Sequence, residues 1–415
     1  MKHLAIVLIA GPLLASPASA QWTRVDQVPI ANMYTVWTRG DTIAAASDST
    51  VLLSTDAGMT WSTSATVAAG ATTVEAVRIH RGRLYAGTFG QGVFVSSDMG
   101  ASWQSFNQGL VGGFADTQLR VMDLLGRGDT LYAATAGAGA WIRNLASVSG
   151  WSHYGSGLEP AQASNVNALA ASDSRLFACA GINGDVHFRD SGDPDWSFDF
   201  LFGQVAAGLE SEAAIWTGSS WLVGTNIGVF RSSAGQSPWT YTDFGLHQTI
   251  RSSFAIHEGV VFTHFASGEG TGIEYSTDDG AIWTVLDALP ATFTYEIASI
   301  GSMLYAGRVD GLWRRSIANV LAIQGGPAAN LHFSIVGPNP IHEKARFQVV
   351  LPRAGQVRID IFDLAGRHVP GGIDQTLPAG ASDVTWQAGS LAPGLYMARL
   401  HAGGRTSTVR LVRLR

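Results

Sequence analysis

The chain has 415 residues, which is long enough for two or three domains. Only 14% of the residues are charged and 49 are Gly, which favours a β-rich fold with many turns. The formal net charge of −6 offers no basic surface for nucleic acid, and the single cysteine, Cys179, excludes an intramolecular disulfide framework.

The first 20 residues have the pattern of a signal peptide. A short basic start at Lys2 and His3 is followed by an apolar run at 4–14 and by small residues at 18–20. The apolar run is too short to span a bilayer as a helix. We expect cleavage before Gln21, and because this residue is not Cys we expect no lipid anchor there.

Tryptophan recurs at a nearly constant spacing. Steps of 39, 42, 48, 45, 43 and 44 residues separate seven markers. A period of about 40 to 45 residues with four short strands is typical of a β-propeller blade, so the chain is predicted to form seven blades over residues 21–318. The markers, each expected to open a fourth strand, are Trp22, Trp61, Trp103, Trp151, Trp196, Trp239 and Trp283.

A second column of short apolar segments supports the same period. Most copies have a small residue at the fourth place, which fits a second strand packed closely between neighbouring blades. The copies lie at 42–45, 84–87, 131–134, 176–179, 221–224, 261–264 and 304–307.

The two ends of the repeat complement each other. The last unit, 295–316, lacks a Trp-led fourth strand, and Trp22 begins a strand that has no blade of its own. We therefore expect residues 21–28 to pair with the strand around 311–315 and so close the ring, which removes open sheet edges.

A turn motif recurs between the third and fourth strands of three blades. It reads STDAGMTW at 54–61, SSDMGASW at 96–103 and STDDGAIW at 276–283. Asp accepts backbone hydrogen bonds in a tight turn, and Gly supplies the positive φ that the turn needs. The motif resembles the Asp box of sialidases, xyloglucanase-type glycoside hydrolases and photosystem-assembly propellers. This resemblance implies an outer turn, away from the ligand face, built by Ser54, Asp56, Gly58, Trp61, Ser96, Asp98, Gly100, Trp103, Ser276, Asp278, Gly280 and Trp283.

Two other blades carry degraded copies of the motif, one with Asp190 and Gly192 and one with Ser233 and Gly235. A structural role fits all copies. A calcium or glycan role for Asp56, Asp98 or Asp278 is the alternative.

The repeat stops near residue 318, and a linker with Gly325, Gly326 and Pro327 follows at 319–332. Short alternating runs separated by Pro and Gly turns then predict a small Ig-like β-sandwich over 333–415. The whole chain is thus expected to be all-β.

The tail resembles the C-terminal sorting domain of type IX secretion cargo. The matching segments are GPNP at 337–340, IDIFDLAGR at 359–367, LAPGLY at 391–396 and VRLVRL at 409–414. The resemblance implies that the type IX machinery recognises residues 333–415. The protein is then secreted or displayed at the cell surface of a Gram-negative-type bacterium. Similar sandwiches in flagellar-hook-capping-like modules are the alternative.

A propeller binds ligands at the mouth of its central channel. Most loops expected on that face are short and rich in Gly, but the longest, 264–272, carries His264 and Glu269 as possible ligand contacts. His264 is alternatively a hydrogen-bonded structural residue. Alignment of the innermost strands predicts one ring of side chains around the axis, which would bind a polar ligand or surround ordered water: Thr35, Glu75, Arg120, Asn167, Ala213, Ser252 and Glu296.

Catalytic signatures are weak. No Arg-Ile-Pro segment or cluster of three Arg residues supports a sialidase, and the only carboxylate pair to nominate for a glycosidase is Glu75 with Glu296. Histidines are scattered one per blade, without the spacing of zinc ligands, so no metal and no cofactor are expected. We expect a monomeric, non-catalytic scaffold that binds a polysaccharide or a surface protein. A divergent sialidase-like or other glycoside hydrolase is the alternative.

Overall fold

The computed structural model describes residues 22–29, 31–70, 73–110, 119–155, 158, 165–180, 184–203, 208–242, 253–267, 270–289, 292–318, 320, 332–335, 341–351, 355–363, 367–378, 380–389, 391–402 and 405–413. The chain divides into two compact units, one ending at Ile317 and one beginning at Ala318, and each is described by itself. The expected signal peptide at 1–20 and most of the expected linker at 319–332 lie outside the described residues. Within the described part of the chain, no helix has the length and hydropathy needed to cross a bilayer.

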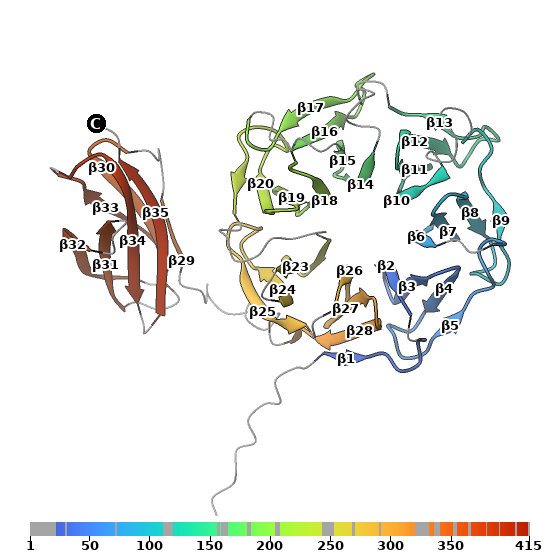
Figure 1. Ribbon diagram of the computed structural model, residues 1–415, viewed down its shortest axis with the longest axis horizontal. Helices are drawn as coiled ribbons and strands as arrows, with labels where there is room; N and C mark the ends of the chain where they lie inside the picture. The colour runs from blue at the N-terminus through green and yellow to red at the C-terminus, as the bar shows by residue number, and fades with distance from the viewer. Residues whose placement is uncertain are drawn as a thin grey trace, which may run out of the picture. The chain divides into compact units, whose positions relative to one another are not determined.

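The first unit is a β-propeller. Its described residues form seven four-stranded antiparallel sheets, which Figure 1 shows arranged in a ring with the first strand of each sheet nearest the axis. In chain order, the first sheet contains β2 (Met33–Arg39), β3 (Thr42–Ser47), β4 (Thr50–Ser54) and β5 (Ser62–Thr63), and the second contains β6 (Val74–His80), β7 (Arg83–Thr88), β8 (Gly92–Ser96) and β9 (Gln104–Ser105). The third contains β10 (Val121–Arg127), β11 (Thr130–Thr135), β12 (Gly139–Asn144) and β13 (Ser152–His153), and the fourth contains β14 (Val166–Ala171), β15 (Arg175–Ala180), β16 (Asp185–Asp190) and β17 (Ser197–Phe200). The fifth contains β18 (Ser211–Trp216), β19 (Trp221–Thr225), β20 (Gly228–Ser232) and β21 (Thr240–Tyr241), and the sixth contains β22 (Phe254–His257), β23 (Val260–Ser267), β24 (Gly270–Ser276) and β25 (Thr284–Leu289).

The seventh sheet joins the two ends of the ring. It contains β26 (Thr294–Ile300), β27 (Met303–Arg308), β28 (Gly311–Ser316) and, as its fourth strand, β1 (Thr23–Arg24). Thr23 pairs with Arg314 and Arg24 with Trp313, and the Val25 amide donates to the Leu312 carbonyl at 2.8 Å. The predicted closure by the N-terminal segment is confirmed.

The second strands are the most buried part of each blade. All seven segments of the predicted column lie in second strands, namely β3, β7, β11, β15, β19, β23 and β27. Their small residues are required by close packing: a Cβ on Gly87 would lie 2.6 Å from Val121 Cγ1, and one on Gly307 would lie 2.7 Å from the Met33 carbonyl oxygen. Both contacts are with a neighbouring sheet, so the residue size at this position sets the spacing between blades.

Each Trp marker directly precedes a fourth strand, as predicted. Five of the indole N–H groups donate to the chain at or just after the fourth strand of the preceding sheet. The bonds run from Trp103 to Ala65 O (3.1 Å), Trp151 to Phe106 O (2.7 Å), Trp196 to Tyr154 O (2.6 Å), Trp239 to Asp199 Oδ2 (3.2 Å) and Trp283 to Thr242 Oγ1 (3.2 Å). The indoles therefore join consecutive blades at the rim.

The three repeated turns share one hydrogen-bond pattern. In the first, Ser54 Oγ donates to Asp56 Oδ1 at 2.8 Å and accepts the Gly58 amide at 2.8 Å. Asp56 also accepts the Thr60 amide at 2.8 Å, and Gly58 adopts a φ of +85°. The turns at 96–103 and 276–283 repeat the Ser–Asp and Ser–Gly bonds. The shared Ser, Asp and Gly of the motif thus close a turn between the third and fourth strands.

The degraded copy at Asp190 uses its carboxylate differently. Arg175 donates two bonds of 2.7 Å to Asp190, and these bonds hold the pKa of that carboxyl below its ordinary value. The same guanidinium donates to the Ala234 carbonyl of the next blade at 2.6 Å. The carboxylate therefore orients a bridge between blades, in place of capping its own turn.

The second unit is a β-sandwich with two antiparallel sheets. One has the order β29 (His332–Ile335), β30 (Lys344–Leu351), β33 (Gly380–Gln387). The other has the order β32 (His368–Leu377), β31 (Gly355–Asp363), β34 (Gly394–Ala402), β35 (Arg405–Arg413). Alternate residues such as Phe347, Ile359 and Leu400 are fully buried between them. This is the predicted architecture for the tail.

Candidate functional site: the central channel of the propeller

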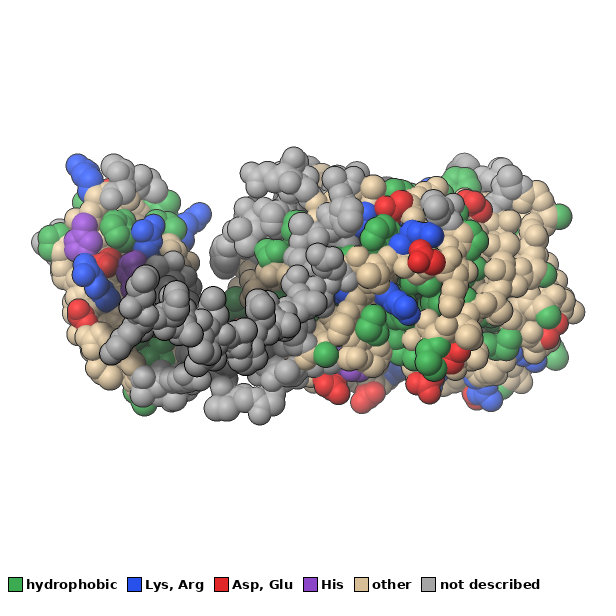
Figure 2. Space-filling view, turned by 90° about the horizontal axis from the view of Figure 1, so that it is seen from below, with side chains coloured by type: hydrophobic (Ala, Val, Ile, Leu, Met, Phe, Trp, Pro, Cys, Tyr) green, Lys and Arg blue, Asp and Glu red, His purple; other side chains and the backbone are tan. Residues whose placement is uncertain are grey.

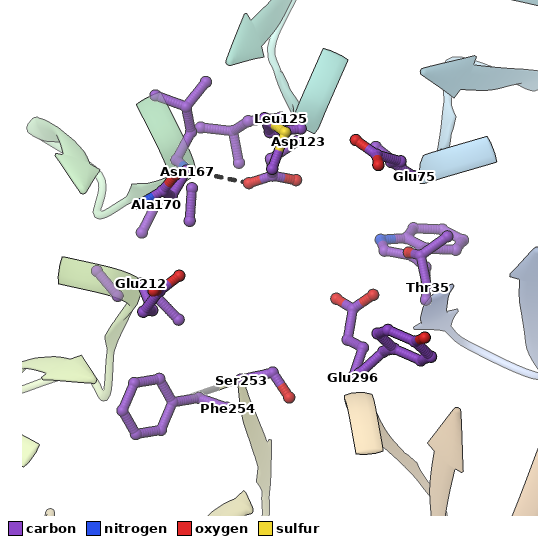
Figure 3. Close-up of a pocket in the computed structure, with 18 of the residues that line it drawn as sticks. Thr35, Glu75, Asp123, Leu125, Asn167, Ala170, Glu212, Ser253, Phe254 and Glu296 are labelled. Carbon is purple, nitrogen blue, oxygen red and sulfur yellow. Dashed lines mark hydrogen bonds between the residues drawn. The ribbon is translucent and has the colours of Figure 1, made fainter. Parts of the chain in front are cut away.

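A channel of about 720 Å³ runs between the innermost strands of the propeller. Its described walls are rich in carboxylates, with only two arginines, and they include several aromatic rings. The acidic side chains are Glu75, Asp123, Glu210, Glu212 and Glu296, the basic ones Arg78 and Arg120, and the aromatic ones Tyr34, Trp37, Trp216, Phe254 and Tyr295. Figure 3 shows the carboxylates of Glu75, Asp123, Glu212 and Glu296 pointing into the cavity from four different blades.

A β-bulge near the start of the innermost strand recurs in six blades. The pairing with the second strand shifts register between Val74 and Ala76, for example, so that Glu75 is an extra residue without a partner on β7. The same shift occurs in β2, β10, β14, β18 and β26.

Because of these bulges, the side chains of the predicted ring do not all lie at one level. Thr35, Ala213 and Glu296 do share one level, because each faces the equivalent residue of its second strand. Glu75 and Asn167 are instead the extra residues of their bulges, and Arg120 precedes β10. Ser252 lies outside the described residues. In the third blade, Asp123 occupies the shared level, whereas the alignment of the innermost strands had selected Arg120.

Side chains at this level satisfy backbone donors of the next blade. Glu296 Oε2 accepts the Val36 amide at 2.9 Å. Ser253 Oγ accepts the Ile297 amide at 2.9 Å, and Asp123 Oδ2 accepts the Leu169 amide at 2.9 Å. Figure 3 shows a dashed line ending on the Asp123 carboxylate. Amides left unpaired inside a protein are costly, so these three side chains stabilise the ring.

Burial changes the ionisation of two of these carboxyls. It raises the pKa of Glu296 to about 7, although Thr35 and the Val36 amide lower it in part. Burial also raises the pKa of Asp123 despite the neighbouring Arg78, whose Nη2 lies 3.1 Å from Asp123 Oδ1. A carboxyl that is half-protonated near neutral pH can donate as well as accept a hydrogen bond.

Glu75 and Arg120 form an ion pair beside the channel. Arg120 Nε lies 3.3 Å from Glu75 Oε2, and its Nη2 lies 3.4 Å from Oε1. The guanidinium carbon is 4.4 Å from the centre of the Phe89 ring, which is 51% exposed and belongs to the turn between β7 and β8. This group of three is here called the Phe89 platform, and it joins an exposed ring to an ion pair that lines the channel.

Asn167, a further residue of the predicted ring, has structural surroundings. Asn167 lines the channel, and its Nδ2 donates to the Ser211 carbonyl of the next blade at 3.0 Å. A pair of tyrosines from neighbouring blades, Tyr34 and Tyr295, lies across the ring closure with ring centres 4.9 Å apart. Rings at this position add a second aromatic surface to the channel wall.

His264 was expected in the longest loop of the ligand face, and this is wrong. The stretch is a hairpin in which β23 continues to Ser267 and β24 begins at Gly270, so His264 lies within a strand and is 2% exposed. Its Nδ1 is 3.3 Å from Ser253 Oγ, and burial lowers its pKa to about 4. Glu269 lies outside the described residues.

No group of three or more His, Cys, Asp or Glu side chains within the described ranges is arranged to hold a metal ion. Cys179 is fully buried among apolar residues, and burial raises the pKa of its thiol, so it is a packing residue of the second-strand column.

Similarity to known proteins identifies the tail. Residues 336–413 match the family described as the secretion system C-terminal sorting domain. The protein is therefore exported. A type IX sorting domain at the end of the chain places the protein outside the cell, either secreted or at the cell surface. No curated protein matches the chain in sequence.

Several solved structures share the fold. YCF48 bound to D1 peptide has a TM-score of 0.54 and 12% identity, with 73% of this chain and 98% of that chain covered. YCF48 from Cyanidioschyzon merolae has a TM-score of 0.54 and 12% identity, over 72% and 99% of the two chains. The extracellular domain of BT4673 from B. thetaiotaomicron has a TM-score of 0.57 and 10% identity, over 96% of this chain and 60% of that chain. At these identities the similarity concerns the fold.

Proposed function

We propose that this protein is an exported, non-catalytic propeller that binds a polysaccharide or a protein segment at the mouth of its channel. Its tail delivers it through the type IX machinery, and residues 21–318 form the mature binding domain. The three repeated turns act as structural Asp boxes. Within this proposal, the turns keep the rim rigid while the channel face carries recognition.

The Phe89 platform is the single observation that carries the proposal. Other rings of this chain are as exposed as Phe89, at 51%, but Phe89 also has a guanidinium beside it that is paired with a carboxylate lining the channel. Aromatic faces stack on sugar rings and on peptide side chains alike. The solved structure of YCF48 with the D1 peptide is a propeller of this fold that binds a peptide, which supports a protein segment as one class of ligand.

The surroundings add polar selectivity. The channel next to the platform has five carboxylates and two arginines in its described walls. A ligand with hydroxyl or amino groups would find hydrogen-bond acceptors there without competing with the Phe89 stacking surface. The rim of the propeller offers less: in Figure 2 its described surface mixes acidic and basic side chains among neutral ones.

The test is a glycan and peptide array probed with the labelled full chain and two variants. Phe89→Ala/Arg120→Ala removes the platform and is expected to lose the signal from the bound probe. Phe198→Ala is the matched control, because this ring is 55% exposed but belongs to the fourth strand β17. Equal binding by wild type and the platform variant would contradict the assignment of the site.

A glycoside hydrolase remains the second candidate, because Glu296 has a pKa near 7 and lines the same cavity as Glu75, whose charge is paired with Arg120. An acid and a base in one cavity are what glycosidases require. Fluorogenic glycosides and sialosides should show no turnover with wild type. Turnover that disappears in Glu75→Gln would replace the binding function with catalysis.

A further inference from the structure

The outer face of the sheet β32-β31-β34-β35 gathers cationic side chains in register. Antiparallel pairing places Arg358 opposite His401, Asp360 opposite Arg399, Phe362 opposite Met397, and Met397 opposite Arg410. Their neighbours in sequence, such as Ile359 and Leu400, point into the core, so this set faces outward. Three arginines and two histidines, counting His368 of β32, thus share one side of the sandwich.

One buried carboxylate organises part of this face. Asp360 has only 10% of its side chain exposed, and it meets Arg358 Nε at 2.9 Å, His368 Nε2 at 3.0 Å and His401 Nε2 at 3.6 Å. Burial raises its pKa, but the bonds from His368 and Arg358 outweigh burial and leave the pKa below its ordinary value. Asp360 is therefore already satisfied by side chains of its own sheet.

Arg399 and Arg410 point outward beside this network. Both are exposed, and the Arg399 guanidinium stacks on the Phe362 ring at 5.0 Å, which fixes its direction. The only other acid among the paired positions of this face is Asp374, opposite Arg358 on the edge strand, and it accepts a bond from Gln356. The face thus keeps an excess of positive charge at its centre.

The charge of the whole tail agrees with this face. From Ala318 onward the sequence has ten Lys and Arg against five Asp and Glu, whereas the part up to Ile317 has 16 against 27. A chain with a net charge of −6 therefore ends in a basic domain. In Figure 2 the sandwich unit shows Arg, Lys and His side chains gathered with few acidic ones.

We infer that this face, with Arg399 and Arg410 at its centre, is the surface by which the sorting domain is recognised, and that its partner is a protein presenting Asp or Glu carboxylates. Complementary charge steers encounter and rejects wrong partners, and Arg recognises carboxylates through two parallel hydrogen bonds. The half-buried Leu395 and Met397 supply apolar contact in the same patch. The inference rests on the export part of the proposed function.

The experiment follows secretion of the full chain in a bacterium that has the type IX system. Arg399→Glu/Arg410→Glu reverses the charge of the face, and we expect the extracellular fraction to fall about tenfold or more, with accumulation in the periplasm. Lys344→Glu/Arg346→Glu is the matched control: it makes the same change in net charge on β30 of the other sheet, where both residues are exposed. The control is expected to be secreted like wild type.

Two further variants keep the outcome clear. Arg399→Lys/Arg410→Lys keeps the charge but loses the two parallel hydrogen bonds of each guanidinium, so its secretion should lie between that of wild type and that of Arg399→Glu/Arg410→Glu. Thermal unfolding of each purified protein checks that the sandwich still folds. A chain truncated after Ile317 tests export itself, because normal secretion of this variant would remove the export proposal. Loss of secretion on truncation together with normal secretion of Arg399→Glu/Arg410→Glu would overturn only the inference about the face.

Two more results would also overturn it. Equal loss in the Lys344→Glu/Arg346→Glu control would show an effect of total charge rather than of this face. Sedimentation with phosphatidylglycerol vesicles provides the other: binding by wild type that disappears in Arg399→Glu/Arg410→Glu would make a lipid surface the partner in place of a protein.

Discussion

Closure of the propeller by its N-terminal segment can be tested with two small substitutions. Val25 and Val28 follow β1, are 3% and 2% exposed, and pack in the core cluster that contains Leu312, Val36 and Tyr305. Val25→Ala/Val28→Ala leaves the backbone pairing of Thr23 and Arg24 possible and removes only the buried methyl groups. The substitution therefore measures how strongly this segment holds the ring closed.

The expected loss follows from the buried carbon atoms. Each Val→Ala change removes two carbons at about 0.8 kcal/mol per buried methylene, and an unfilled cavity adds to this. The pair should lower the free energy of unfolding by about 3–4 kcal/mol. At about 2–4 °C per kcal/mol for domains of 150–250 residues, the melting temperature of the larger propeller should fall by about 5–10 °C.

Tryptophan fluorescence during heating is a suitable assay, because all of the 13 tryptophans except Trp386 belong to the propeller. Gln27→Ala is the control, since this exposed residue lies between the two valines and should change stability by less than about 0.5 kcal/mol. A shift in the melting temperature no larger than that of the control would refute the closure as a source of stability. Deletion of residues 22–29 should have a larger effect, because it also uncovers the edge of β28.

Three other outcomes follow from the turns and the channel. Ser54→Ala removes the buried hydroxyl that accepts the Gly58 amide and should cost about 1–2 kcal/mol in urea unfolding; an unchanged midpoint would contradict the capping role. The hydrogen bonds from Thr60 and Ser54 lower the pKa of Asp56 to about 2, so the contribution of this carboxylate to stability is present above pH 4 and is lost as the pH falls toward 2. Asp56→Asn should flatten the plot of stability against pH in this range. Parallel plots for wild type and variant would disprove the effect. The pKa of Glu296 is raised to about 7, so the folded state holds a proton that the unfolded state releases near pH 4.5. The stability of the protein should therefore fall as the pH rises from 4.5 to 7. Glu296→Gln should remove this slope from melting temperatures measured between pH 5 and 8.

Much of the fold was predictable because it repeats. The Trp spacing located the fourth strands, since an indole that must reach the preceding blade cannot move along the sequence without losing its acceptor. Trp22, which begins a strand with no blade of its own, and the incomplete last unit together predicted the closure. Pairing of the two ends is a long-range contact, but the count of strands required it.

The channel was less predictable, and the bulges are the reason. Glu75 and Asn167 are the extra residues of bulges that recur in six blades, whereas Thr35 and Glu296 are the residues after such a bulge. Because the loops between the Trp markers and these strands vary in length, counting from the markers cannot separate the two neighbouring positions. Asp123 had a signal of its own: it is the one charged residue in the apolar run Val121–Leu125. The position of His264 was predicted wrongly because the Gly and Ser residues at 267–272 suggested a loop, whereas two strands extend through this stretch.

The partners Thr23 and Arg314 are separated by 291 positions along the chain. A ring fastened in this way cannot finish assembling until nearly the whole propeller sequence is available, since its last sheet takes strands from both ends. Gathering such distant segments carries an entropic cost that grows with the logarithm of the separation, and contacts of this kind slow folding. Refolding after dilution from urea should accordingly end in a slow step, and a synthetic peptide of residues 22–29 added to a chain that lacks them should speed recovery of the native fluorescence.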